Sequence, residues 1–281
     1  MMPIKNLLVA TDFTDRSERA VERALQLRNL AGRGRLTLLH VIAAGLPPEL
    51  INRRRSEAET LFAERLASVP IDPDVQTSVV TDDPFSAIIS EAVIRRVDLV
   101  VIGAPGKHRY ADRFMGTTAE CVIRFSDRPV LMVRNASEAP YRRVLVAFDG
   151  SEGAIRALHT ALAIAPGAEF RVVHAWWPAH TALGESEAAR QAIGEENDHL
   201  KALIEQAAKE AIASSPSPPA KLAIDMVENN PYLVMRNEST WPDLLVMGTH
   251  SKGRLATTIS VGKLARHLLG EVTCDVLVTR P

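Results

Sequence analysis

The chain has 281 residues, 46% of them hydrophobic, and its 33 Lys and Arg nearly balance its 34 Asp and Glu. This length predicts two domains of about 140 residues each. The near-neutral charge argues against a general nucleic-acid-binding protein, which would carry a basic surplus. Because there is no apolar run of about 18 residues and no signal-peptide pattern at the start, we expect a cytoplasmic protein that does not bind membranes.

Strand and helix patterns alternate along the first half of the chain. Apolar runs predict strands at 5–10, 35–41, 75–80, 98–102 and 129–133. Helical spacing of apolar residues predicts helices from about 15 to the glycine at 32, and at 49–68, 85–94 and 118–125. At the start of the first helix, Asp15 and Glu18 have the spacing of a capping box.

The same succession restarts after a polar, proline-containing linker at 134–142. Strands are expected at 144–148, 169–175, 222–227, 243–247 and 276–278, and helices at 152–165, at 187–213, after Pro231 and at Lys263. Corresponding motifs in the two halves are separated by nearly constant intervals. We therefore predict a duplicated module, with domains at 1–136 and 141–281.

Alternating strands and helices predict an α/β fold in which helices cover both faces of a parallel sheet. In such sheets a ligand binds beyond the carboxyl ends of the strands, where the direction of winding reverses. If the first and fourth strands are neighbours there, Asp12 and Gly103 face each other. The carboxylate could then accept hydrogen bonds from a ribose or a base, while the glycine loop holds phosphates.

The loop after the fourth predicted strand carries Gly103, Gly106 and Gly116, followed by Thr117-Thr118-Ala119-Glu120, which indicates a helix start. We interpret the glycines as positions that allow positive φ and let an anion approach the backbone. The free N–H groups of the first helical turn carry partial positive charge. Strand, glycine loop and helix start together are typical of phosphate binding.

These motifs resemble the universal stress protein family in its tandem two-domain form. The resemblance covers both halves and rests on Ala10-Thr11-Asp12-Phe13-Thr14, on Val146-Ala147-Phe148-Asp149-Gly150-Ser151, on the strands that contain His40 and His174, and on the glycine spacing. It implies two doubly wound, Rossmann-like sheets with strand order 3-2-1-4-5, as in the related nucleotide-α-hydrolases. It also implies that the two fifth strands could pair to form an internal pseudo-dimer, and it leaves a further homodimer open.

By the same resemblance, Asp12 and the backbone at Val41 would contact adenosine, and Gly103 and Gly106 would lie at the ribose and the α-phosphate. The outer phosphates would contact Gly116, Thr117 and Thr118. The second half departs from the pattern, because Ser251 replaces the middle glycine and Lys263 replaces the hydroxyl residue. A second, weaker nucleotide site there would comprise Asp149, Ala175, Gly248, Ser251, Gly262 and Lys263.

We expect an adenine-nucleotide-binding stress-response protein that acts as a sensor or regulator, with ATP as the ligand, Mg²⁺ accompanying it, and AMP as an alternative. The sequence has no Walker lysine, positioned base or covalent nucleophile, so at most slow ATP hydrolysis is expected. Its eight histidines form no metal-binding motif. The alternative is a scaffold or signalling module that binds a protein partner or an apolar ligand and keeps a vestigial nucleotide site. A nucleotide-α-hydrolase enzyme ranks third.

Overall fold

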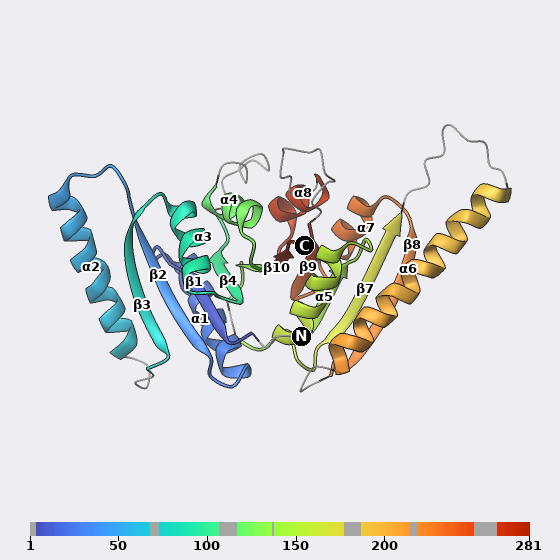
Figure 1. Ribbon diagram of the computed structural model, residues 1–281, viewed down its shortest axis with the longest axis horizontal. Coiled ribbons are helices and arrows are strands. Elements are labelled where there is room, and N and C mark those ends of the chain that lie inside the picture. Colours follow the sequence, from blue (N-terminus) through green and yellow to red (C-terminus); the bar gives the residue numbers. More distant parts are fainter. Residues whose placement is uncertain are drawn as a thin grey trace. The chain divides into compact units, whose positions relative to one another are not determined.

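The structure is a computed structural model that describes residues 4–67, 73–106, 117–136, 138–176, 187–213, 218–249 and 263–281. Within it, the chain divides into two compact units, Pro3–Pro140 and Tyr141–Pro281. Each unit is built from parallel strands connected by helices (Figure 1).

The first unit, blue to green in Figure 1, contains five parallel strands in the order β3-β2-β1-β4-β5. This order confirms the predicted fold class and places β1 directly beside β4. The elements are β1 (Asn6–Ala10), α1 (Asp15–Leu30), β2 (Arg35–Ala43), α2 (Pro48–Ala67), β3 (Val75–Asp82), α3 (Pro84–Ile94), β4 (Leu99–Gly103), α4 (Thr118–Phe125) and β5 (Val130–Val133).

The second unit repeats the arrangement, with strand order β8-β7-β6-β9-β10. Its colours in Figure 1 run from green to red. The elements are β6 (Arg143–Ala147), α5 (Glu152–Ile164), β7 (Glu169–Trp176), α6 (Glu187–Ala213), β8 (Lys221–Glu228), α7 (Pro231–Glu238), β9 (Leu244–Gly248), α8 (Lys263–Glu271) and β10 (Asp275–Thr279).

The core of each unit lies along its central strands. In β1, Leu7, Leu8 and Val9 are fully buried, because helices cover both faces of the sheet. Right-handed crossovers place α1 and α2 on one face and α3 and α4 on the other, since the chain moves along the sheet in opposite directions at the two pairs. The direction of winding reverses between β1 and β4.

The sequence predicted α4 and α6 with their observed bounds, and most strand ends to within one or two residues. The predicted capping box at the start of α1 is wrong. Asp15 is already the first helical residue, and the N-cap is Thr14, whose side chain makes no capping hydrogen bond. The Thr14 hydroxyl instead donates to Asp12 Oδ1, and Glu18 forms an ion pair with Arg65. Asp12 and Arg65, the partners of Thr14 and Glu18, both lie outside the first helical turn, which is the only part of the chain that the capping-box pattern describes.

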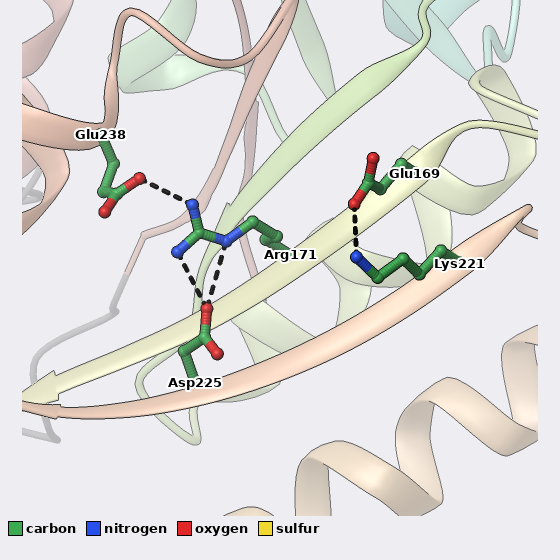
Figure 2. Close-up of polar contacts among 5 residues, drawn as sticks. All are labelled: Glu169, Arg171, Lys221, Asp225 and Glu238. Carbon is green, nitrogen blue, oxygen red and sulfur yellow. Dashed lines mark hydrogen bonds and ion pairs between the residues drawn. The ribbon is translucent and has the colours of Figure 1, made fainter.

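Charged side chains connect β7, β8 and the end of α7 in the second unit, as Figure 2 shows. Arg171 lies 3.0 Å from Asp225 Oδ2 and 2.7 Å from Glu238 Oε2, and Lys221 lies 3.0 Å from Glu169 Oε1. Burial opposes the charge on Arg171, but the hydrogen bonds to the two carboxylates outweigh it and raise its pKa. The Arg171 guanidinium is thus satisfied by the unit itself and holds neighbouring elements together.

In each unit, the strand that lies beside the first strand across the reversal of winding ends in a glycine. These strands are β4 and β9. In the second unit this glycine is Gly248, where an added Cβ would lie 2.2 Å from the backbone nitrogen of Ala154 in α5. Gly248 does not have positive φ. The position requires glycine because the helix backbone approaches the strand end too closely for any side chain.

We therefore expect Gly248→Ala to lower the urea midpoint of unfolding, at a cost of about 1–3 kcal/mol for overpacking. Gly194→Ala in α6 is the matched control, because nothing lies within 4 Å of its added Cβ. A helical glycine replaced by alanine should gain up to about 1 kcal/mol. Circular dichroism during urea unfolding measures both, and equal midpoints for the two variants would contradict the close approach.

Candidate functional site

A cavity of about 350 Å³ opens at the carboxyl ends of β1 and β4 in the first unit. This is the place where the direction of winding reverses, and the volume is in the range of small-molecule sites. The lining comes from the ends of β1, β2 and β4, the loops that follow β1 and β4, and the first turns of α1, α3 and α4. It comprises Ala10, Thr11, Asp12, Thr14, Arg16, Ser17, Leu39, Val41, Pro84, Ile88, Ile102, Gly103, Ala104, Pro105, Gly106, Thr117, Thr118 and Ala119.

The structure brings together six of the seven residues predicted for the first site. The residues Asp12, Val41, Gly103, Gly106, Thr117 and Thr118 all line this one cavity, although up to 106 positions separate them in the sequence (118 − 12). The seventh, Gly116, lies outside the described residues. The roles that the family resemblance gives to these side chains stay predictions.

Asp12 is held by a network at the start of α1. Its Oδ1 accepts hydrogen bonds from the backbone N–H of Thr14 at 3.1 Å and from the Thr14 hydroxyl at 2.6 Å. Its own N–H donates to the Ser17 hydroxyl at 3.2 Å. Burial opposes ionisation of the carboxyl, but the hydrogen bonds from Thr14 and Ser17 outweigh it and hold the pKa of Asp12 below its ordinary value. The lining of the cavity therefore includes an ionised carboxylate.

The residue after Asp12 has an uncommon backbone conformation. Phe13 adopts φ of 61°, a left-handed value that bulky residues seldom take. Its ring packs on His40 and Phe62, with ring centroids 4.7 and 5.0 Å apart. The His40 Nδ1–H donates to the Thr11 carbonyl oxygen at 2.9 Å, as expected for a structural histidine. These contacts fix the turn that points Asp12 at the cavity.

Gly103 is required for a different reason from the one the sequence suggested. It does not adopt positive φ. An added Cβ would lie 2.9 Å from the Arg16 carbonyl oxygen and 3.2 Å from Ser17 Cα, so the first turn of α1 lies directly against the end of β4. The interpretation of Gly103 and Gly106 as left-handed positions is therefore wrong, because neither has positive φ, and the role of Gly103 is close packing of backbone on backbone.

The first turn of α4 forms the opposite wall of the cavity. Thr117 is the N-cap, and its hydroxyl accepts from the Glu120 N–H at 3.2 Å. In the described part of the chain, no hydrogen bond pairs the N–H groups of Thr118 and Ala119, as is usual at a helix start. Both residues line the cavity. This wall therefore offers backbone donors and the positive end of a helix dipole to an anion.

The cavity also has an apolar part, of which only Val41 was predicted. Leu39 and Val41 contribute from β2, and Pro84 and Ile88 contribute from the start of α3. The pattern gave no signal for Pro84 and Ile88, because their place at the cavity depends on how α3 crosses the sheet. Apolar walls next to a carboxylate and a helix N-terminus suit a ligand with a flat apolar ring and a charged tail.

Arg16 is the second feature that the sequence reasoning missed. It is the second residue of α1, is exposed and lines the cavity. A signal existed, since a cation four positions after Asp12 must lie near the same strand end.

The corresponding region of the second unit shares the backbone plan but differs in detail. Asp149 Oδ1 accepts from the Ser151 N–H at 3.0 Å, and His174 Nδ1–H donates to the Phe148 carbonyl oxygen at 2.8 Å. Gly150 has φ of 78°, matching Phe13. Ala175 lies in β7 and Gly248 ends β9. Of the other predicted residues, Ser251, Gly262 and the Lys263 side chain lie outside the described structure.

The family model described as "Universal stress protein family" matches residues 3–134 and 140–280. The chain belongs to the universal stress protein family. The chain is 29% identical over 137 residues to a universal stress protein of Thermus aquaticus, covering 46% of this chain and 98% of that protein. It is 26% identical over 154 residues to one of Methanocaldococcus jannaschii, covering 46% and 94%. Each of these relatives thus corresponds to about half of this universal stress protein.

Two solved structures resemble the tandem form over nearly its whole length. A universal stress protein of Archaeoglobus fulgidus has a TM-score of 0.68 at 19% identity and covers 99% of both chains. A functionally unknown protein of Pseudomonas aeruginosa has a TM-score of 0.67 at 19% identity and covers 99% of this chain and 93% of its own. At this identity the likeness shows the fold alone.

Membrane-spanning helices and clusters of metal-binding side chains are both absent from the residues that the structure describes in this universal stress protein. None of the helices there is long and apolar enough to cross a membrane. The same residues form no group of three or more His, Cys, Asp or Glu that could hold a metal ion.

The network around Asp12 predicts that Thr14→Ala raises the pKa of Asp12 toward its ordinary value of 3.8, because the shortest hydrogen bond to the carboxylate is lost. A lowered pKa stabilises the fold above pH 3.8, and that contribution disappears as pH falls through the folded pKa. Titration of the Asp12 carboxyl by NMR measures the shift. Thr60→Ala on α2 is the control and should leave Asp12 unchanged, whereas identical titration in all three proteins would contradict the assignment.

Proposed function

We propose that this universal stress protein binds an adenine nucleotide, ATP, in the cavity of the first unit and acts in the cytoplasm as a sensor or regulator in the stress response. One observation carries the proposal. A single cavity joins an apolar wall, the Asp12 carboxylate and the N-terminus of α4. An apolar wall suits a base, a carboxylate suits ribose hydroxyls, and a helix N-terminus suits phosphates.

The positions of these groups support one binding mode. The apolar part at Val41, Pro84 and Ile88 suits the base, and Asp12 can accept hydrogen bonds from ribose hydroxyls. The N–H groups of Thr118 and Ala119 suit phosphate oxygens. Mg²⁺ would be held chiefly by the phosphates of ATP, as is usual for this ion, and it would supply charge neutralisation there.

The cavity is better suited to binding than to fast catalysis. Asp12 is the one acidic side chain among its described lining residues, which include no histidine, lysine or cysteine. The nearby His40 ring is fixed by Thr11 and Phe13. A positioned base and additional charge stabilisation are what rapid phosphoryl transfer needs. We therefore propose slow hydrolysis at most.

A second candidate is a scaffold that binds a protein partner or an apolar ligand. Val93 and Ile94 favour it, because these neighbouring residues at the end of α3 are 47% and 72% exposed. Mass spectrometry of what the denatured, extensively purified protein releases separates the two functions. Release of adenine nucleotide supports the first, and release of a lipid supports the second.

Asp12 and Asp149 provide a matched pair for testing nucleotide binding. Both accept a hydrogen bond from the N–H two residues later, so substitution removes the same local contact in each unit. We expect Asp12→Ala to weaken ATP binding about tenfold, because a charge-assisted hydrogen bond to the ribose is lost. Asp149→Ala should retain the wild-type affinity.

Isothermal titration calorimetry of the full chain with Mg-ATP measures this difference. If Asp149→Ala weakens binding and Asp12→Ala does not, the site lies in the second unit. If the wild type binds no ATP at millimolar concentration, the proposed function is wrong.

A further inference from the structure

We propose that Arg16 is a phosphate-binding residue that makes the first unit select nucleotides by the length of their phosphate chain. The inference rests on the proposed function and extends it, because it assigns ligand selectivity to a side chain outside the glycine pattern. Arg16 lines the cavity from the first turn of α1.

The guanidinium of Arg16 lies against the backbone of Gly106. A Cβ built at Gly106 would lie 2.9 Å from Arg16 Nη1, 3.2 Å from its Cζ and 3.3 Å from its Nη2. All three atoms thus lie close to the point where a side chain at residue 106 would begin. The guanidinium occupies the space that a side chain at residue 106 would take, in the loop between β4 and α4. The absence of a side chain at Gly106 therefore allows this placement.

The charge of Arg16 is not neutralised within the described part of the chain. No ion pair joins it to a carboxylate of the described residues, and its acidic neighbour Glu18 pairs with Arg65 instead. A cation in the first turn of a helix is unfavourable, because the helix dipole is positive at that end. An anion in the cavity would offset both charges.

The ligand that fits this arrangement is a polyphosphate. The first turns of α1 and α4 both line the cavity, so two helix N-termini and a guanidinium lie around it. Arginine binds phosphate oxygens through two parallel N–H groups, which gives more affinity than a point charge of the same sign. A nucleoside triphosphate offers more oxygens to this group than a monophosphate, and a nucleoside offers none.

The second unit lacks this cation. Gly153 is the second residue of α5, as Arg16 is of α1, and it follows Asp149 by four positions as Arg16 follows Asp12. An added Cβ at Gly153 would lie 2.6 Å from the Thr249 carbonyl oxygen, so the backbone excludes a side chain there. The cation that Arg16 supplies in the first unit therefore has no counterpart at the equivalent position of α5.

Calorimetric titration of the full chain with ATP, AMP and adenosine tests the assignment. We expect Arg16→Gln to weaken ATP binding about tenfold, which corresponds to ~1.4 kcal/mol, and to leave adenosine binding unchanged. Arg16→Lys should recover part of the loss, because it keeps the charge without the fork. Arg54→Gln, an exposed arginine on α2 away from the cavity, is the control and should match the wild type.

The possible outcomes separate this inference from the proposed function. Equal ATP affinity in Arg16→Gln and the wild type would overturn the inference, as would an equal loss for ATP and adenosine. A wild type that binds adenosine as tightly as ATP would overturn it too, while nucleoside binding itself stood. A wild type that binds none of the three ligands would overturn the proposed function and the inference with it.

Discussion

The contact between the end of β4 and the first turn of α1 determines the rest of the site. Gly103 lies so close to the Arg16 backbone that no side chain fits between them. This approach brings the loop after β1, the loop after β4 and two helix N-termini to one edge of the sheet. The second unit repeats it at Gly248 and Ala154 with an even shorter distance. The glycine is thus a packing requirement of the duplicated module, and the cavity of the first unit is built on it.

The sequence predicted the fold well because its signals are local. Buried strands are recognisable in the sequence as apolar runs. Helix ends are recognisable too, such as the start of α4 after its N-cap Thr117 and the end of α6 at Ala213. The expected strand order also predicted that Asp12 and Gly103 would face each other at one edge of the sheet, and the family resemblance added the backbone at Val41. Other features depend on three-dimensional contacts that no window contains. The Asp15–Glu18 capping box failed because Glu18 pairs with Arg65 of α2, and Pro84 and Ile88 were missed because a helix crossing brings them to the cavity.

The two units show how a duplicated plan can diverge in chemistry while keeping its backbone. At the turn after the first strand, Phe13 and Gly150 share the left-handed conformation, and His40 and His174 each donate to the carbonyl at the strand end. The side chains near the strand edge differ, however. Phe13 packs on Phe62, whereas a Cβ at Gly150 would lie 2.6 Å from Leu200 Cδ2. Arg16 lines a cavity in the first unit, whereas Gly153 has no room for a side chain. The backbone plan alone therefore does not make the units equivalent as binding sites.

We propose that one universal stress protein chain holds one ATP, in its first unit. Equilibrium dialysis of the full chain against radiolabelled Mg-ATP measures the number of nucleotides bound per chain at saturation. The different surroundings of Asp12 and Asp149 predict a stoichiometry of one. Saturation at two per chain with equal affinities, or no bound nucleotide at all, would contradict the claim.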